Sequence, residues 1–399
     1  MRKLSRLILT YMEYEGKEVL AAATQEQGSI RRLSLSKKGQ DSILGNIYIG
    51  KVKNIVKNIR AAFIEIENKI MCYYSLDEKC PPFLTNRRTG GELKIGDELL
   101  VQVSKEAMKS KLPCVTGNLN FTGRYLVLTS GRRELGFSAK LKKEEQKRLR
   151  KLLEGQSPKD AGLIVRTNAA EASPEEILKE LKELAGRYEL LKKKAVSRVC
   201  FSLLEQSMPR YLKAFQDAYI QDLEEIVTDD EEIYGQLMEY TEQYPENTIQ
   251  VRLYRDKLLP LYKLYSLESV LEGALNKKVW LKSGGFLVIE QTEAFVSIDV
   301  NTGKFSQKKE VEETFRKINL EAAKEIALQL RLRNLSGIIL IDFINMENPQ
   351  YREELMKTLQ AYLRQDTIKG NVVDMTPLNI VEVTRKKVEK PLAEEVRDL

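Results

Sequence analysis

Two short stretches determine the predicted fold of the last third of this chain, Ala294-Phe-Val-Ser-Ile-Asp-Val-Asn-Thr-Gly303 and Gly337-Ile-Ile-Leu-Ile-Asp-Phe-Ile-Asn345. Each is an apolar run with an aspartate at its end, which predicts a buried strand that carries a carboxylate at its carboxyl end. Between them, apolar residues recur at steps of three and four, as in a helix laid on a sheet: Val311, Phe315, Ile318, Ala322, Ile326 and Leu330. A strand, a helix and a strand in this order favour a right-handed crossover between parallel strands. Asp299 and Asp342 should then emerge at the same edge of the sheet, where α/β folds place ligands.

The side chains at these strand ends suit a hard divalent cation. Asp299 and Asp342 would meet two amides, Asn301 and Asn345, and magnesium prefers oxygen ligands. A cation held there would polarise a phosphodiester, lower the pKa of a bound water and offset charge on the departing oxygen. The alternative is structural, with each aspartate capping the turn after its strand. The pattern by itself leaves both interpretations open.

Composition narrows the chemistry. The 399 residues include no histidine, which excludes Ser-His-Asp and Cys-His nucleophiles, paired-histidine RNA cleavage and histidine-ligated zinc or iron. A hydrolase of this composition must use carboxylates, Lys or Tyr, or a metal held by oxygen. The net charge of +7 favours polyanionic partners.

Cysteine usage and the lack of a targeting pattern predict a cytoplasmic protein with no membrane partner. The cysteines are Cys72, Cys80, Cys114 and Cys200. They are widely spaced and form no CxxC pair, as is typical of reduced thiols. The apolar stretch from Leu7 to Met12 is too short to span a membrane and runs into Glu13.

The N-terminal half is rich in short β segments. The first forty residues alternate like strands but are too few to fold alone. Five further segments have the spacing of a small closed barrel of the OB type, at 46–52, 61–66, 72–76, 99–103 and 125–128. Aromatic residues with nearby lysines suit single-stranded nucleic acid, namely Phe63, Tyr73 and Tyr74 with Lys105, Lys109 and Lys111. A place in the core is the alternative for Phe63.

Helical patterns and cations follow. A charged helix is predicted at Leu141–Glu154, then a strand at Gly162–Thr167, and Ser173-Pro-Glu-Glu176 is a capping box that opens another helix. The helix between the two aspartates carries Arg316, Lys317, Lys324, Arg331 and Arg333 on its outer side, after Lys304, Lys308 and Lys309 in the preceding loop. Beside a metal site, such cations would hold a phosphate backbone. The alternative is an ordinary solvated helix face.

Several of these stretches together resemble the catalytic region of the ribonuclease E/G family. The matching segments near the aspartates are Ile298-Asp-Val-Asn-Thr-Gly303, Glu312-Glu-Thr314, Asn319-Leu-Glu-Ala-Ala323, Leu328-Gln-Leu-Arg-Leu-Arg-Asn-Leu-Ser-Gly337 and Ile341-Asp-Phe-Ile344. Those upstream are Asn46-Ile-Tyr48, Ala61-Ala-Phe63, Gly123-Arg-Tyr-Leu-Val-Leu128 and Gly162-Leu-Ile-Val-Arg-Thr167. Each motif is short, but their joint order and spacing are specific and cover nearly the whole chain.

The resemblance implies a magnesium-dependent endoribonuclease that cuts single-stranded RNA and leaves a 5′-phosphate on the downstream product, with manganese as the other candidate ion. It assigns the metal to Asp299 and Asp342, with Asn301 in support. The implied pocket for a 5′-monophosphate is formed by Gly123, Val127, Arg166 and Thr167. The implied RNA-binding residues are Phe63, Tyr73 and Lys111. Without the resemblance, Arg166 would be interpreted as a surface charge at a strand end.

The implied fold is α/β with several domains. A ribonuclease H-like subdomain would combine residues 1–41 with 206–274. Two regions would be inserted in it, an OB-fold RNA-binding barrel at 42–117 and a 5′-sensor subdomain at 118–205. A DNase I-like catalytic subdomain would occupy 275–399.

The chain departs from the family pattern in three places. The family's cysteine pair, which links two protomers through zinc, would follow Lys390, but no CxxC occurs there and the dimerisation domain is missing. We therefore expect no structural zinc. The sequence leaves open the oligomeric state, and whether the chain is naturally short or truncated. Asn345 stands where some members have a second aspartate, which would reduce negative charge near the metal. Pro377 stands where some have an arginine near the 5′ phosphate, which predicts a weaker sensor.

Two rival functions stay open from sequence. One is a non-catalytic RNA-binding or ribosome-associated factor that keeps the barrel. Retention of both aspartates and Asn301 argues against it, whereas the missing C-terminal parts argue for it. The other is a DNA nuclease.

Overall fold

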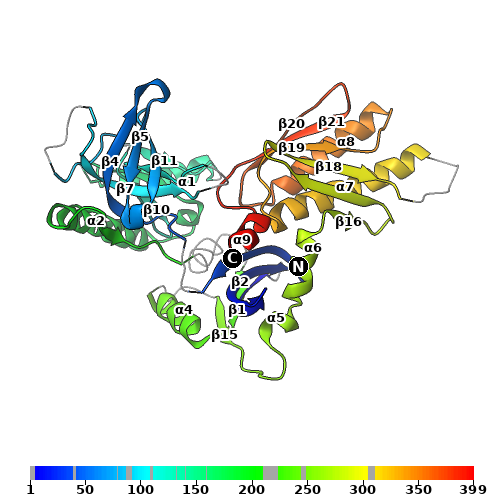
Figure 1. Cartoon of the computed structure of the whole chain (residues 1–399), viewed down its shortest axis with the longest axis horizontal. Coiled ribbons are helices and arrows are strands. Elements are labelled where there is room, and N and C mark those ends of the chain that lie inside the picture. Colours follow the sequence, from blue (N-terminus) through cyan, green and yellow to red (C-terminus); the bar gives the residue numbers. More distant parts are fainter. Residues whose placement is uncertain are drawn as a thin grey trace. The chain divides into compact units, whose positions relative to one another are not determined.

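A computed structural model gives the fold of the chain in two compact units, residues 1–40 with 222–399 and residues 41–221 (Figure 1). Each unit is described by itself. The structure describes residues 5–38, 42–78, 80–86, 92–107, 111–131, 133–139, 141–158, 160–209, 223–243, 249–303 and 311–399. Within these residues, every helix is too short or too polar to cross a membrane.

The first unit contains a five-stranded sheet in the order β15-β14-β1-β2-β3. Its strands are β1 (Ser5–Tyr14), β2 (Lys17–Glu26), β3 (Ser29–Lys37), β14 (Leu223–Thr228) and β15 (Gln250–Leu253). The associated helices are α4 (Glu231–Gln243), α5 (Leu261–Leu264) and α6 (Leu267–Leu275). Because β1 pairs in parallel with β14, the three N-terminal strands are completed by a segment two hundred positions further along the chain. Ile8 of β1 and Leu267 and Leu271 of α6 belong to the same buried core.

The second unit contains a closed five-stranded barrel. Its strands are β4 (Ile47–Val56), β5 (Ala61–Glu65), β6 (Met71–Ser75), β7 (Glu98–Lys105) and β8 (Cys114–Thr116), with two 3-10 turns, η1 (Lys57–Ile59) and η2 (Glu67–Lys69). The order is β4-β5-β6-β8-β7, and β7 pairs with β4 to close the ring. A sixth strand, β13 (Leu203–Glu205), pairs antiparallel with the first two residues of β4, Ile47 and Tyr48. The predicted barrel of the OB type is therefore present.

The prediction of the fifth barrel strand at 125–128 was wrong. That segment belongs to β10 (Leu126–Thr129), in a separate sheet of order β11-β12-β10-β9. The other strands of this sheet are β9 (Asn120–Thr122), β11 (Leu135–Phe137) and β12 (Gly162–Val165). The true fifth strand, β8, has only three residues and lies between Pro113 and Gly117, so it is too short to produce a recognisable period-2 pattern.

Two helices cover this smaller sheet, α1 (Lys143–Leu153) and α2 (Pro174–Ser197), with a 3-10 turn, η3 (Thr167–Ala170). The predicted capping box is confirmed, because the Ser173 hydroxyl accepts from the Glu176 N–H and the Glu176 carboxylate accepts from the Ser173 N–H at 2.7 Å. Leu149 of α1 and Leu181 of α2 join the strands in one buried core.

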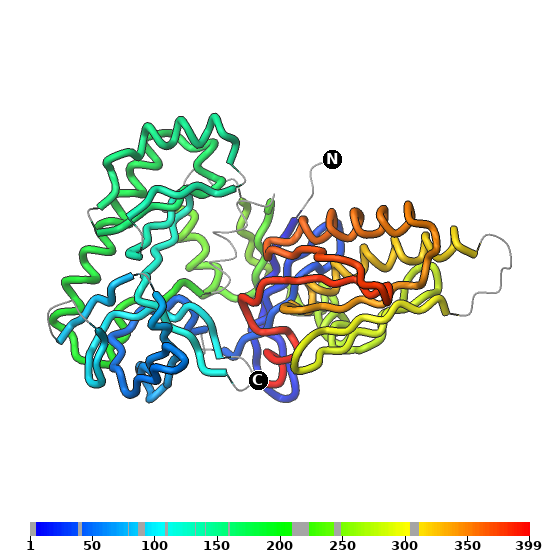
Figure 2. The backbone as a smooth tube through the Cα atoms, turned by 90° about the horizontal axis from the view of Figure 1, so that it is seen from above, coloured from blue at the N-terminus to red at the C-terminus, as the bar shows by residue number. Residues whose placement is uncertain are grey.

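The first unit also contains a six-stranded sheet in the order β16-β17-β18-β19-β21-β20. Its strands are β16 (Lys278–Trp280), β17 (Phe286–Gln291), β18 (Phe295–Asn301), β19 (Gly337–Asp342), β20 (Gly370–Met375) and β21 (Ile380–Arg385). The helices are α7 (Val311–Leu332), α8 (Pro349–Leu363) and the short α9 (Leu392–Asp398). Only β18 and β19 pair in parallel, and α7 is the crossover between them, as the sequence predicts. Helices α7 and α8 lie side by side over one face of this sheet (Figure 2).

A buried arginine fixes the connection between α7 and β19. Arg385, at the end of β21, donates from Nε to Asp366 Oδ2 at 2.8 Å, with the two side chains only 2% and 7% exposed. Its Nη1 donates to Asn334 Oδ1 and to the Leu335 carbonyl, both at 2.9 Å. One guanidinium thus joins the end of β21, the turn after α8 and the loop that leads into β19. Such a pair sets the local geometry, since each charge is costly to bury alone.

We expect Arg385→Met to lower the free energy of unfolding by about 3–5 kcal/mol, because the Asp366 carboxylate would stay buried without its partner. Urea denaturation of the purified protein measures the change. Arg364→Met is the matched control, since Arg364 is exposed in the same region and should change stability by less than about 0.5 kcal/mol. Equal stability of Arg385→Met and wild type would show that the buried pair does not hold this connection.

Candidate functional site

The two predicted aspartates lie opposite each other. Asp299 is the third residue from the end of β18, and Asp342 is the last residue of β19. The register of the two parallel strands pairs their Cα atoms directly. Asn301, two residues after Asp299 on the same strand, donates from Nδ2 to Asp299 Oδ2 at 2.8 Å. The structure therefore brings these three side chains together, as the parallel crossover predicts.

The carboxylates project from the face of the sheet that the helices leave uncovered. Along β18, Val296, Ile298 and Val300 are buried, whereas Asp299 is exposed. The same alternation holds in β19, where Ile341 is buried and Asp342 is exposed. Because successive side chains of a strand point to opposite faces, the apolar set packs on α7 and α8 and the acidic set faces outward. The site is a patch on an open sheet face near the carboxyl ends of two strands.

Electrostatics at this patch favour a cation. Partial desolvation, and then the negative charge of Asp299, raise the pKa of the Asp342 carboxyl. Two like charges side by side disfavour the doubly ionised state unless a positive charge offsets them. Within the described residues, no cluster of three or more Asp, Glu, Cys or His side chains forms a metal site. Two carboxylates and an amide oxygen nevertheless fit magnesium, which commonly takes one or two carboxylates and completes its shell with waters and substrate phosphate.

Sequence reasoning missed a buried clamp behind Asp342. Asn319 of α7 is fully buried; its Nδ2 donates to the Ile344 carbonyl at 2.7 Å and its Oδ1 accepts from the Ile344 N–H at 3.1 Å. The Glu312 carboxylate accepts from the Asn348 N–H at 2.6 Å. Helix α7 therefore holds the segment that follows Asp342 at two points. The available signal was a polar residue, Asn319, beside Ile318 within the apolar stripe of the helix.

The side chain of Asn345 is hydrogen-bonded to a neighbouring loop and not to the aspartate pair. Its exposed side chain accepts from Asn379 Nδ2 through Oδ1 at 3.0 Å. Asn379 belongs to the turn between β20 and β21, so Asn345 joins two loops.

Neither interpretation of the α7 cations, contact with a phosphate backbone or an ordinary solvated helix face, fits three of the five residues. Arg316 is paired with Glu313 and Glu354, Arg331 with Glu26, and Arg333 is buried with its Nη1 on the Asn276 carbonyl. Moreover, α7 covers the face of the sheet opposite to the aspartates. The solvated-face alternative holds for Lys317 and Lys324, which are exposed. Lys304, Lys308 and Lys309 lie outside the described residues.

On the barrel, Phe63 and Tyr73 form a cross-strand pair on the outer surface. They are register partners in β5 and β6, and their rings meet edge to face with centroids 6.5 Å apart. Both are half-buried, whereas the flanking Ile64 and Cys72 point into the barrel core. Phe63 is therefore not a core residue. The prediction that Tyr74 suits contact with single-stranded nucleic acid was wrong, because the alternation turns its side chain inward and leaves it 2% exposed.

The lysines named with these rings differ in position. Lys111 is exposed two residues before Pro113, whose carbonyl accepts from the Tyr73 N–H at 2.8 Å. Lys105 is exposed at the end of β7, and Lys109 lies outside the described residues. The surface around Phe63 and Tyr73 thus has exposed cations on the adjoining segments.

Of the four residues assigned to a 5′-phosphate pocket, Gly123 and Arg166 are in direct contact beside the smaller sheet. Arg166 follows β12 directly and donates from Nη1 to the Gly123 carbonyl at 2.6 Å. The Thr167 hydroxyl lies 3.2 Å from the Ser138 hydroxyl. Val127 is half-buried in β10, which pairs with β12. Contact between Gly123 and Arg166 comes from the pairing of these two strands.

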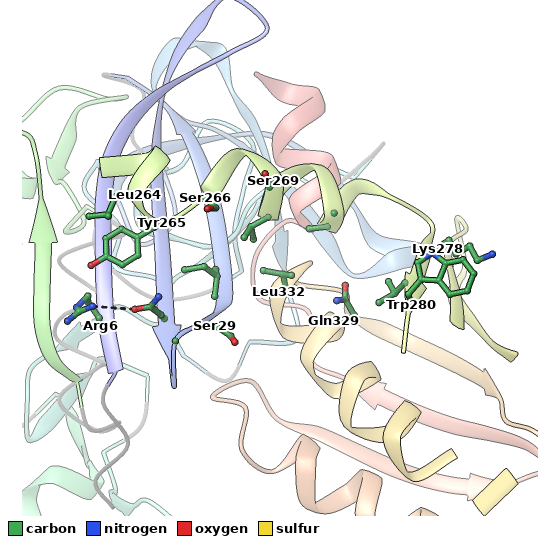
Figure 3. Close-up of a pocket in the computed structure, with 17 residues that line it drawn as sticks. Arg6, Ser29, Leu264, Tyr265, Ser266, Ser269, Lys278, Trp280, Gln329 and Leu332 are labelled. Atoms are coloured by element: carbon green, nitrogen blue, oxygen red, sulfur yellow. Dashed lines mark hydrogen bonds between the residues drawn. The ribbon is translucent and has the colours of Figure 1, made fainter. Parts of the chain in front are cut away.

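A separate cavity of about 940 Å³ opens between the N-terminal sheet, α6 and β16 (Figure 3). Arg6 lies at one end and is paired with Glu225 and, at 3.4 Å, with Gln25. Trp280 and Lys278 lie at the other end, with the ammonium 4.1 Å from the indole centroid. The described residues that line the cavity include no Asp, Glu or Cys, so the cavity offers no carboxylate or thiolate to a cation and is distinct from the aspartate pair.

Comparison with known proteins shows that the chain is similar to one family over most of its length. Residues 120–388 match the profile of the ribonuclease E/G family. The chain is 32% identical over 375 residues to ribonuclease G of Salmonella typhimurium (strain SL1344), which covers 90% of this chain and 76% of that protein. It is 32% identical over 380 residues to ribonuclease G of Escherichia coli (strain K12), covering 92% and 77%. It is 33% identical over 383 residues to ribonuclease E of Synechocystis sp., covering 94% and 56%.

The raised pKa of Asp342 generates a prediction about stability. A carboxyl whose pKa is raised on folding holds its proton more strongly in the native state, so its contribution to stability is present at low pH and is lost as the pH rises through that pKa. In EDTA, we therefore expect Asp342→Asn to melt at a higher temperature than wild type at pH 8, with the difference shrinking as the pH falls towards 4.

Addition of Mg²⁺ should raise the melting temperature of wild type and leave that of Asp342→Asn nearly unchanged, because only the intact carboxylate pair binds the ion in the native state. Thermal melts across pH, with and without Mg²⁺, measure both effects. If Mg²⁺ raised the melting temperature of the two proteins equally, the ion would not bind at this patch.

Proposed function

The chain belongs to the ribonuclease E/G family, and from this premise we propose that it is a metal-dependent endoribonuclease that cuts single-stranded RNA. Family membership implies an RNA substrate and a role in RNA processing or decay. The observation that carries the proposal for this chain is the register of Asp299 with Asp342, with Asn301 bonded to the first carboxylate. The absence of histidine leaves metal and carboxylate chemistry as the consistent route.

Asp299 and Asp342 would hold Mg²⁺, the ion that enzymes of this family typically use, or Mn²⁺. When bound, such an ion would polarise the substrate phosphate and lower the pKa of a bound water. The Asn301 amide orients the Asp299 carboxylate, and the Asn319 clamp fixes the backbone that follows Asp342. Hydrolysis would join a water oxygen to phosphorus and break the bond from phosphorus to the 3′ oxygen. The products are a 3′-hydroxyl and a 5′-phosphate.

The remaining regions fit supporting roles in this proposal. The barrel within 42–117 would bind RNA, with the partly exposed rings of Phe63 and Tyr73 stacking on bases and Lys111 contacting the backbone. Residues 118–205 would recognise the 5′ end. We assign a ribonuclease H-like subdomain to 1–41 with 206–274 and a DNase I-like catalytic subdomain to 275–399. The mixed α/β architecture and the closed barrel support this arrangement.

In the 5′-end pocket, Arg166 would pair with phosphate oxygens and the Thr167 hydroxyl would add a hydrogen bond. The contact of Arg166 with the Gly123 carbonyl supports this role, since it already directs the guanidinium towards the turn between β9 and β10. Gly123 and Val127 would complete the pocket from that turn and from β10.

We expect Asp299→Asn and Asp342→Asn each to lower the rate of RNA cleavage by about 10²-fold or more, because loss of either carboxylate weakens both metal binding and charge stabilisation in the transition state. RNA affinity should stay near that of wild type or increase. The measurement incubates a 5′-labelled single-stranded RNA with the protein in Mg²⁺ and in EDTA, and compares fragments with binding.

Glu382→Gln is the matched control, since it removes a carboxylate from β21, the neighbour of β19, two positions away from Ile380, the register partner of Asp342. It should cleave like wild type. RNA binding without metal-dependent fragments would favour a non-catalytic factor instead, and equal cleavage of competing single-stranded DNA would favour a general nuclease.

Arg166→Ala should lower the preference for 5′-monophosphorylated over 5′-hydroxyl RNA by about tenfold, because a charge-assisted bidentate contact would be lost on one substrate only. Cleavage rates on two RNAs that differ only at the 5′ end measure the effect. Equal losses on both RNAs would instead assign Arg166 to general RNA binding or to the fold.

A further inference from the structure

A buried glutamate lies directly behind the turn that carries Gly123. Glu180 is in the second turn of α2 and is 5% exposed. Its carboxylate accepts hydrogen bonds from three successive backbone N–H groups of the turn and the first residue of β10. The distances are 2.7 Å from Arg124 to Oε2, and 2.9 Å from Tyr125 and 2.7 Å from Leu126 to Oε1.

Glu180 occupies a position where the helix pattern calls for an apolar side chain. It is buried on the same face of α2 as Ile177, Leu181 and Leu184. Burial raises the pKa of the Glu180 carboxyl, while the three backbone hydrogen bonds act in the opposite direction. A carboxylate in an apolar core needs such partners, and here three of them come from one short segment, residues 124–126.

The contact with Glu180 leaves no room for a side chain at position 123. A Cβ atom at position 123 would lie 2.4 Å from Glu180 Oε1 and 2.5 Å from Glu180 Cδ. Since three hydrogen bonds hold the carboxylate in place, it has little room to move aside. Glycine at 123 therefore allows the turn to sit directly on Glu180, a reason for this residue that involves no ligand.

The same turn also contacts Arg166 on its other side. The Gly123 carbonyl accepts from Arg166 Nη1 at 2.6 Å, and the Tyr125 carbonyl accepts from the Arg166 N–H at 2.8 Å. The conformation of residues 123–126 thus decides where the acceptor for the Arg166 guanidinium lies. N–H groups of this turn bind Glu180 and its carbonyls bind Arg166.

We infer that Glu180 is a positioning residue for recognition of the RNA 5′ end: through the N–H groups of residues 124–126 it fixes the turn that orients Arg166. The inference rests on the proposed 5′-phosphate pocket. Glu180 does not touch the phosphate, and its effect on the substrate passes through the backbone of the turn and the Arg166 side chain.

Glu180→Gln tests the inference. Glutamine has the same shape but replaces one acceptor oxygen with an NH₂ group, so at least one N–H of the turn loses its acceptor. Because a misplacement of about 1 Å can cost roughly 100-fold, we expect the preference for 5′-monophosphorylated over 5′-hydroxyl RNA to fall about tenfold or more. Cleavage of the 5′-hydroxyl RNA should stay close to the wild-type rate.

Glu183→Gln is the matched control, because Glu183 is exposed on the same helix and should keep the wild-type preference. Glu180→Asp, which keeps the charge but shortens its reach, gives a second variant if Glu180→Gln does not fold, and should show an intermediate loss. Circular dichroism melts confirm that each variant is folded at the assay temperature. A purely structural role would lower cleavage of both RNAs equally, and that outcome, or an unchanged preference in both Glu180 variants, overturns the inference.

Binding of the same two RNAs in EDTA separates this inference from the catalytic proposal, since it needs no cleavage. If Asp299→Asn and Asp342→Asn cleave normally but Glu180→Gln loses 5′-end preference in binding, the catalytic assignment fails and the inference stands. If metal-dependent cleavage is confirmed but wild type binds and cleaves both RNAs equally, the 5′-end pocket and the inference fail together.

Discussion

The parallel pairing of β18 with β19 is the constraint on which the candidate site depends. Parallel neighbours require a crossover, and α7 supplies it on one face of the sheet. Once the two strands are in register, Asp299 and Asp342 become direct neighbours, because a period-2 pattern leaves each residue only two faces. A slip of one residue in either strand would bury one carboxylate under the helices. The clamp from Asn319 and the Arg385 network act on the two ends of β19, and so both protect this register.

The sequence predicted this unit well because its signals are strong and local. The apolar runs ending in Asp299 and Asp342 are long enough to show their character, and the stripe from Val311 to Leu330 has a clear helical period. The capping box at Ser173 also depends only on residues within one turn. The gathering of Gly123 with Arg166 came instead from resemblance to a family, since no local pattern indicates which strands of a small sheet are neighbours.

The failures have a common physical origin in tertiary context. Strand β8 is too short to produce a pattern, so the sequence predicts the fifth barrel strand at a stronger apolar run, which belongs to β10. Arg331 and Arg333 look like solvated cations by spacing, but their partners come from distant segments, Glu26 and Asn276. The roles of Asn319 and Glu180 could not be predicted for the same reason. The backbone groups that they hydrogen-bond lie 25 and about 55 positions away in the chain. Polar residues within apolar stripes were the unused signal.

The exposure of Asp299 and Asp342 on a sheet face has a consequence for the topology of a substrate. A deep pocket admits a chain end or a nucleotide flipped out of its strand, whereas a flat exposed patch sets no such limit. A polymer can lie across it and continue in both directions, so an internal bond reaches the carboxylates without threading. In the proposed endoribonuclease, recognition of an RNA end would then depend on residues away from this patch. The choice of the RNA molecule and the choice of the bond to be cut would therefore be made by different parts of the protein.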